Sequence, residues 1–169
     1  MPYAAAILTA SDSSSAGEYE DTSGAAIREL LATIGFEVAK YEVVPDERDM
    51  IADLLRSWAD SGQVQLIVTT GGTGLGPRDV TPEATKSVLD YEVPGIVEAM
   101  RAEGLLHTPM SMISRAIAGV RNRVLIINLP GNPRGVRENL AVVLPVLQHA
   151  LDLLAGGGRD HGRSPSQQT

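Results

Sequence analysis

Four segments of the chain are apolar and almost uninterrupted, and each has the length of a β-strand. They cover Tyr3–Ala10, Phe36–Val44, Leu66–Thr70 and Val124–Asn128. Continuous apolar runs, rather than strict alternation, are typical of strands that a parallel sheet buries on both faces. The pattern therefore predicts a buried sheet whose strands are spread along the whole chain.

Between these runs, apolar residues recur at the three- and four-residue spacing of amphipathic helices. In the third predicted helix we expect Thr81 as N-cap and Pro82 in the first turn. Pro94 and Pro109 should break the stretch 88–115 into one or two further helices, and Pro145 could kink the last helix. The clearest predicted helices are one with apolar positions from Ala25 to Ile34, one from Met50 that ends near Ser61-Gly62, one starting at Thr81–Glu83 and a long one after Pro133 to about Leu154.

Strands that alternate with helices predict an α/β fold, with a three-layer αβα arrangement and a mostly parallel sheet. At 169 residues the chain suits one domain with a full-sized core. We expect this domain to cover residues 1–155. Residues 156–169 lack apolar side chains, and we expect a disordered tail there.

Composition narrows the functional classes. The formal net charge of −7 argues against a general nucleic-acid binder, so we expect no nucleic-acid partner. Cysteine is absent, which excludes a disulfide framework, a thiolate nucleophile and a zinc–cysteine site. The first apolar run has no basic region before it and is too short for a signal peptide or membrane span. A cytoplasmic protein without a membrane partner is therefore expected.

Four polar or glycine-rich loops follow the predicted strands. They are Ser11–Asp21, Pro45–Asp46, Gly71–Asp79 and Pro130–Pro133. In open α/β sheets, ligands bind at the carboxyl ends of the strands. We therefore expect loops from distant parts of the sequence to meet at one edge of the sheet and to form the ligand site.

The loop TTGGTGLGPRD, residues 69–79, is the most unusual of these segments. Glycines allow a ligand to approach the backbone amides closely, and successive amides followed by a helix N-terminus suit a phosphate. The loop lacks the Gly-Lys-Ser/Thr of a Walker A motif, and its glycine spacing differs from the dinucleotide fingerprint. A purely structural turn is the alternative interpretation.

Asp46 and Asp79 lie at strand ends beside this loop. Asp46 could instead be a helix N-cap, and Asp79 could instead pair with Arg78 or cap the turn. Carboxylates beside phosphates repel them unless a metal ion lies between, and Mg²⁺ favours one or two carboxylates together with phosphate oxygens and water. The pair therefore indicates a Mg²⁺-nucleotide site.

At the level of whole motifs, TTGGTGLGPRDVTPEAT and LPGNPRGVRENL resemble the MogA/MoaB-type molybdopterin-binding family, which includes the gephyrin-type G domains. SDSSSAGEYEDTSG, VVPDER, EVPGIVEAMR and HTPMSMISRAIAGVRNRVLIIN extend the resemblance over about residues 3–154. One departure is Ser11-Asp12-Ser13, where family members often have Ser-Asp-Arg. If that arginine binds an anion in the family, another residue must replace it, and we expect a C-terminal arginine.

The resemblance implies a reaction and a set of roles. Mg-ATP would adenylylate molybdopterin, giving adenylyl-molybdopterin and pyrophosphate, through attack of the molybdopterin phosphate on the α-phosphorus. The aspartates Asp46 and Asp79 would hold Mg²⁺ and orient the ATP phosphates. Nucleotide- and phosphate-binding residues would be Ser11, Asp12, Asp21, Gly71, Gly72, Thr73 and Gly74. The expected molybdopterin-binding residues are Ser111, Ser114, Arg115, Pro130, Gly131, Asn132 and Pro133.

Alternatives remain open for several of these assignments. Ser114 and Arg115 could be a surface pair at a helix end, and Asn132 could form an Asx turn before Pro133. The chain could be a molybdopterin-binding carrier or a scaffold paralogue without the main activity, or a nucleotide-binding domain with another acceptor. The resemblance also implies a homotrimer and a downstream MoeA-type molybdate-inserting partner.

Overall fold

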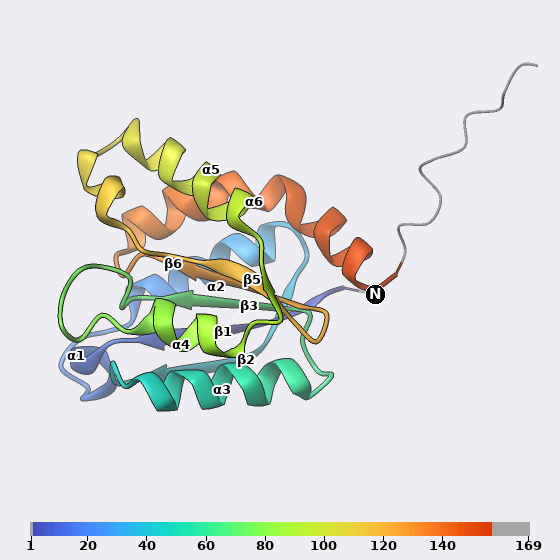
Figure 1. Ribbon diagram of the computed structural model, residues 1–169, viewed down its shortest axis with the longest axis horizontal. Coiled ribbons are helices and arrows are strands. Elements are labelled where there is room, and N and C mark those ends of the chain that lie inside the picture. The colour runs from blue at the N-terminus through green and yellow to red at the C-terminus, as the bar shows by residue number, and fades with distance from the viewer. Residues whose placement is uncertain (1, 157–169) are drawn as a thin grey trace, which may run out of the picture.

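A computed structural model describes residues 2–156 of the chain as a six-stranded sheet with helices on both faces (Figure 1). The strand order is β2-β1-β3-β6-β5-β4. The predicted tail, apart from Gly156, lies outside the described residues. The strands are β1 (Ala4–Ala10), β2 (Glu37–Val44), β3 (Leu66–Thr70), β4 (Tyr91–Glu92), β5 (Ala118–Arg121) and β6 (Val124–Leu129).

The helices form the two outer layers of the predicted three-layer fold. Helices α2, α5 and α6 cover one face of the sheet, and α3 and α4 cover the other (Figure 1). Within the described residues, no helix has both the length and the apolar character needed to cross a membrane. The helical segments are α1 (Asp12–Ser15), α2 (Thr22–Thr33), α3 (Arg48–Asp60), α4 (Thr81–Val88), α5 (Pro94–Leu105), the 3-10 segment η1 (Pro109–Ile113) and α6 (Pro133–Leu154).

Strand β1 shows why its sequence is continuously apolar. Ala5 and Ile7 point into the core beneath α2 and α6, whereas Ala6 and Leu8 point into the core beneath α3 and α4. All four side chains are fully buried. Since successive side chains of a strand lie on opposite faces, a strand covered on both sides needs apolar residues at every position.

Four strands run in the same direction, so their carboxyl ends lie at one edge. β1 pairs in parallel with β2 and β3, and β3 pairs in parallel with β6. The register aligns Thr9 with Thr70 and Thr70 with Leu129. The loops that leave β1, β3 and β6 therefore begin at the same level, as predicted from the strand pattern.

Two elements were missing from the sequence interpretation. Strands β4 and β5 extend the sheet beyond β6. β5 pairs antiparallel with β6, and β4 pairs antiparallel with β5. The hairpin between β5 and β6 turns at Asn122 and Arg123, which both have positive φ, 47° and 66°. Two such residues form a type I′ turn, but the usual Asn-Gly signal is absent because arginine occupies the second position.

Some predicted helix boundaries were also wrong. Helix α2 begins at Thr22, because the Asp21 side chain accepts a hydrogen bond from the Gly24 amide (2.9 Å) and caps it. The N-cap of α4 is Val80 rather than Thr81, and Pro82 lies in the first turn as expected. The predicted breaks at Pro94 and Pro109 are confirmed as the starts of α5 and η1.

The hairpin turn generates a prediction about stability. A non-glycine residue in the left-handed region costs about 1 kcal/mol, and glycine removes that cost. We expect Arg123→Gly to raise the free energy of unfolding by about 1 kcal/mol, measured by chemical denaturation. Arg48→Gly, in the first turn of α3, is the matched control and should lower it. A destabilising effect of Arg123→Gly would contradict the turn assignment.

Candidate active site

Two pockets lie side by side at the carboxyl edge of the sheet, and the loop after β6 separates them. Pro130 and Asn132 line one pocket, whose volume is about 490 Å³, and Gly131 lines the other, of about 400 Å³. We call the larger one the serine pocket and the smaller one the aspartate pocket. The serine pocket is lined by Gly104, His107, Thr108, Met110, Ser111, Ser114, Pro130, Asn132, Arg134, Gly135, Glu138 and Asn139.

The aspartate pocket brings together all four loops that the sequence singled out. Among the predicted residues it contains both aspartates, two glycines, Ser11, Asp21 and Gly131. Asp12, Thr73 and Gly74 are not among the residues that line it. Its lining residues are Thr9, Ala10, Ser11, Ser13, Ser14, Tyr19, Glu20, Asp21, Thr22, Ser23, Asp46, Thr70, Gly71, Gly72, Asp79 and Gly131.

Two glycines of the loop after β3 have conformations that other residues rarely adopt. Gly71 and Gly72 have φ values of 91° and 67°. A Cβ on Gly71 would overlap the carbonyl oxygen of Ala10, and one on Gly72 would lie 3.1 Å from Oδ1 of Asp46. Glycine is therefore required here both for backbone geometry and for close packing.

The same loop keeps several amides available. The Gly71 amide donates to the Leu129 carbonyl (3.2 Å), which ties the loop to the end of β6. Within the described residues, the amides of Gly72, Thr73 and Gly74 have no hydrogen-bond acceptor. Adjacent unpaired amides beside the start of a helix can bind an anion such as a phosphate.

Asp79 closes the glycine loop on itself. Its Oδ2 accepts a hydrogen bond from the Gly76 amide (2.8 Å), and Cβ atoms on Gly74 or Gly76 would lie 2.9 Å from this oxygen. Of the two structural alternatives for Asp79, capping of the turn is therefore present. Pairing with Arg78 is not, because that guanidinium binds Asp12 and Glu47. The Asp79 side chain therefore lines the aspartate pocket.

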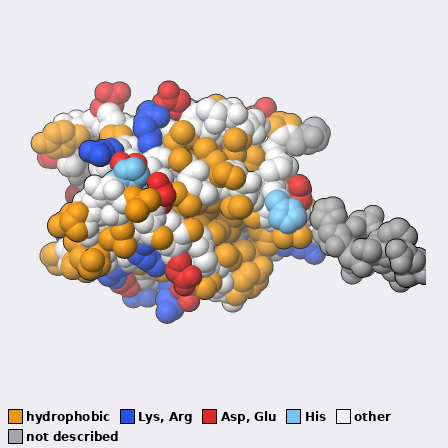
Figure 2. Space-filling model, turned by 90° about the horizontal axis from the view of Figure 1, so that it is seen from above, with side chains coloured by type: hydrophobic (Ala, Val, Ile, Leu, Met, Phe, Trp, Pro, Cys, Tyr) orange, Lys and Arg blue, Asp and Glu red, His pale blue; other side chains and the backbone are white. Residues whose placement is uncertain are grey.

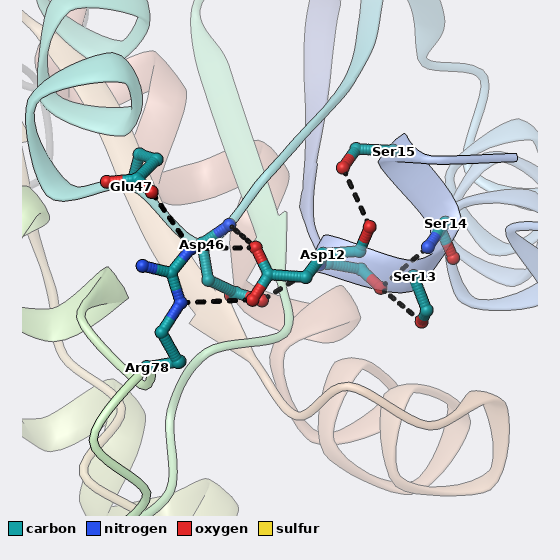
Figure 3. Close-up of polar contacts among 8 residues, drawn as sticks. Asp12, Ser13, Ser14, Ser15, Asp46, Glu47 and Arg78 are labelled. Carbon is teal, nitrogen blue, oxygen red and sulfur yellow. Dashed lines mark hydrogen bonds and ion pairs between the residues drawn. The ribbon is translucent and has the colours of Figure 1, made fainter. Parts of the chain in front are cut away.

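Asp46 and Asp12 hold each other through reciprocal hydrogen bonds (Figure 3). The Asp12 amide donates to Oδ2 of Asp46 (3.0 Å), and the Asp46 amide donates to Oδ1 of Asp12 (2.9 Å). The N-cap of α3 is Glu47, so Asp46 is not the N-cap that the alternative interpretation proposed. These bonds join the ends of β1 and β2.

Arg78 compensates part of the negative charge at this edge. It contacts both oxygens of Asp12, at 3.1 and 2.9 Å, and Oε1 of Glu47 at 2.9 Å (Figure 3). This guanidinium holds the pKa of the Asp12 carboxyl below its ordinary value. An arginine from the glycine loop thus lies beside Ser11-Asp12-Ser13, while the expectation that a C-terminal arginine binds an anion there stays a prediction.

Asp46 has the opposite electrostatic environment. Burial raises the pKa of its carboxyl, and the negative charges of Asp12 and Asp79 raise it further. Beside it, Oγ1 of Thr81 is buried and has no hydrogen-bond partner among the described residues. Repelling carboxylates next to an unsatisfied hydroxyl fit a cation and its water molecules.

The carboxylates do not form a complete metal site by themselves. Within residues 2–156, no group of three or more His, Cys, Asp or Glu side chains is arranged to hold a metal ion. Mg²⁺ commonly takes one or two carboxylates and completes its shell with water and substrate phosphates. Asp46 and Asp79 fit this second kind of site.

Several predicted residues also have structural roles. Asp21 caps α2 and accepts hydrogen bonds from the hydroxyls of Thr9 (2.6 Å) and Tyr41. Ser11 caps α1 by accepting from the Ser14 amide (3.2 Å). Asn132 caps α6 by accepting from the Gly135 amide (2.7 Å), so the predicted Asx-type turn is present at the wall between the pockets.

The structure distributes the predicted molybdopterin-binding residues unevenly. Ser111, Ser114, Pro130 and Asn132 line the serine pocket. Arg115 lies behind the glycine loop instead, where it contacts main-chain carbonyls and Glu83. Pro133 starts α6. Arg134, Glu138 and Asn139 on the first turns of α6 line the same pocket, and the sequence analysis did not select them. Their spacing of four and five residues, which places them on one side of a helix, was the sequence pattern that could have indicated them.

Comparison with known proteins shows to which family the chain belongs. The family model described as a probable molybdopterin binding domain matches residues 6–149. The chain belongs to this molybdopterin-binding family. As a member, it resembles the Thermus thermophilus molybdopterin biosynthesis enzyme MoaB, with 58% sequence identity and a TM-score of 0.86 over 91% of this chain and 97% of that one.

Other relatives in the family are named molybdopterin adenylyltransferase or Mog protein. The molybdopterin adenylyltransferase of Helicobacter pylori strain J99 is 47% identical over 152 residues, which cover 89% of this chain and 86% of the relative. The Mog protein of Mycobacterium ulcerans is 41% identical, with a TM-score of 0.85 over 92% of this chain and 99% of that one. The predicted family and fold class are thereby confirmed.

The charges at the pocket edge predict opposite effects of two matched substitutions. The raised pKa of Asp46 means that folding disfavours its ionised form, a cost present at neutral pH and absent once the pH is below the carboxyl range. Asp46→Asn should therefore raise the melting temperature of the ligand-free protein at pH 7. This gain should disappear in acid.

Asp12→Asn is the control for that experiment. The lowered pKa of Asp12 is a stabilisation present above the ordinary carboxyl pKa and lost as the pH falls through the folded-state pKa. This variant should lower the melting temperature modestly at pH 7, because both partners are solvent-exposed. Equal effects of the two variants would contradict the electrostatic description.

Proposed function

We propose that this protein is a molybdopterin adenylyltransferase of molybdenum-cofactor biosynthesis. It would transfer AMP from Mg-ATP to the terminal phosphate of molybdopterin and release pyrophosphate. The observation that carries the proposal is the pair of adjacent pockets, one with aspartates and open amides and one with serine and asparagine side chains, divided only by the Pro130–Asn132 loop. Relatives of 47% identity bear the adenylyltransferase name.

In this assignment, the aspartate pocket binds the nucleotide phosphates. The amides of Gly72, Thr73 and Gly74 bind phosphate oxygens, and Ser11 and Asp21 lie at the nucleotide edge. Asp46 and Asp79 would hold Mg²⁺, which supplies neutralising charge to the triphosphate when bound. Burial and then the negative charges of Asp12 and Asp79 raise the pKa of Asp46, and a metal at these carboxylates would offset the repulsion.

The serine pocket would bind molybdopterin. Ser111, Ser114, Pro130 and Asn132 line it, and Gly131 lies on the nucleotide side of the same wall. The molybdopterin phosphate would then attack the α-phosphorus of ATP as the bond to pyrophosphate breaks. Because a phosphate is already ionised near neutral pH, the reaction needs alignment and charge stabilisation rather than a strong general base.

A carrier that binds molybdopterin without transferring AMP is the second candidate. The observation behind it is the 58% identity to a protein named molybdopterin biosynthesis enzyme MoaB, a name that states no adenylyl transfer, against 47% identity to the Helicobacter pylori adenylyltransferase. Incubating the pure protein with molybdopterin, labelled ATP and Mg²⁺ separates the two. Pyrophosphate and a pterin–AMP adduct that depend on both pterin and metal support the enzyme. Molybdopterin binding without either product supports the carrier.

Asp79→Asn tests the assigned role of the loop carboxylate. We expect it to lower turnover at least about a hundredfold, the effect of losing a major electrostatic stabiliser, and to leave the melting temperature nearly unchanged. The control is Asp49→Asn, an exposed carboxylate in the first turn of α3. Near-normal turnover of a folded Asp79→Asn protein would contradict the role.

We further propose that the protein is a homotrimer in the cytoplasm and delivers its product to a MoeA-type molybdate-inserting enzyme. Figure 2 shows exposed hydrophobic side chains over α5 and α6, which support association with another chain. Sedimentation should give three times the monomer mass, whereas a monomer mass would refute the trimer. The surface proposed for association includes a groove between α5 and α6, which is lined by Gly95, Ile96, Ala99, Val142, Val143 and Val146.

A further inference from the structure

Arg115 contacts the glycine loop at several points. Its Nε donates to the Gly74 carbonyl (2.7 Å), and one terminal nitrogen donates to the Asp79 carbonyl (2.7 Å). Its own backbone amide donates to the Thr73 carbonyl (2.8 Å). One residue therefore holds both ends of the loop segment between Thr73 and Asp79.

Glu83 holds the Arg115 side chain in this position. The two side chains form an ion pair, and the guanidinium holds the pKa of the Glu83 carboxyl below its ordinary value. Glu83 lies in the first turn of α4, which follows the glycine loop directly. The arginine thus bridges the loop and the helix that carries the loop's far end.

The neighbours of Arg115 face the other pocket. Ser111 and Ser114, four residues and one residue before Arg115 in the chain, line the serine pocket. Arg101 holds this segment by donating to the carbonyls of Ser114 (3.3 Å) and Ala116 (3.0 Å). A single short segment therefore contacts one pocket with its serines and the loop of the other pocket with its arginine.

We propose that Arg115 is a positioning residue of the nucleotide site, which fixes Asp79 and the glycine loop relative to the serine pocket, and not a contact of the pterin. This inference rests on the proposed function for the identity of the two substrates. A guanidinium suits the task because its planar, five-donor geometry can bind two carbonyls and a carboxylate at once. Lysine, with one ammonium group, cannot reproduce that arrangement.

The test uses Arg115→Lys and Arg115→Gln in the full-length chain. The affinity for a non-hydrolysable ATP analogue with Mg²⁺, the affinity for molybdopterin and turnover are measured separately. We expect Arg115→Gln to weaken Mg-nucleotide binding and to lower turnover, each by about tenfold or more, as for the loss of charge-assisted hydrogen bonds. Arg115→Lys should fall between this variant and the wild type. Molybdopterin affinity should stay within about twofold of the wild type, since the substitution removes no contact with molybdopterin.

Arg121→Gln is the matched control. Arg121 makes a similar clamp away from both pockets, because it pairs with both oxygens of Asp60 (3.0 and 2.8 Å) and donates to the Val88 carbonyl (3.0 Å). Its replacement should lower the melting temperature without changing Mg-nucleotide affinity. A purely structural role of Arg115 would likewise lower the melting temperature of Arg115→Lys and Arg115→Gln and leave their Mg-nucleotide affinity unchanged, and this result would overturn the proposal.

Two other results also decide the matter. A loss of molybdopterin affinity with unchanged nucleotide affinity would make Arg115 a pterin contact and would overturn the positioning role. If the wild-type protein binds Mg-nucleotide and molybdopterin but Arg115 variants match it, the inference fails while the proposed function stands. A wild-type protein that binds neither substrate would instead refute the proposed function.

Discussion

Electrostatic repulsion among carboxylates is the constraint on which the site depends. Parallel strands end at one edge, and the loops there bring Asp12, Asp46 and Asp79 together. Arg78 compensates Asp12, whereas Asp46 keeps a raised pKa in a partly buried position. Such an arrangement costs stability in the free protein, and this cost is typical of residues kept for function. A cation with a polyphosphate would offset it.

The surrounding structure keeps these carboxylates in place through main-chain contacts. Asp12 and Asp46 bond to each other's amides, Asp79 bonds to the Gly76 amide, and Arg115 holds the Asp79 carbonyl. Backbone amides and glycines leave room for a ligand that side chains would occupy. The site is therefore ordered before a ligand binds, which is the condition for catalysis by alignment and charge.

Sequence reasoning succeeded where the local pattern is itself the cause of the structure. Leu66–Thr70 was predicted with its observed bounds, because a buried parallel strand needs an uninterrupted apolar run. It failed at the β5–β6 hairpin, where Arg123 adopts a positive φ that local preference disfavours and pairing with the sheet imposes. At Asp21 it indicated a nucleotide-binding residue and missed the additional structural role of this side chain as the N-cap of α2.

The sequence by itself determined the layered fold, the family and the four loops that meet at the aspartate pocket, since periodicity and motifs are local properties of the chain. Only the tertiary structure decided which side chains meet. It paired Arg78 with Asp12 rather than Asp79, put Arg115 behind the glycine loop, and divided two pockets with the Pro130–Asn132 loop. These contacts join residues far apart in the chain, and no spacing in the sequence encodes them.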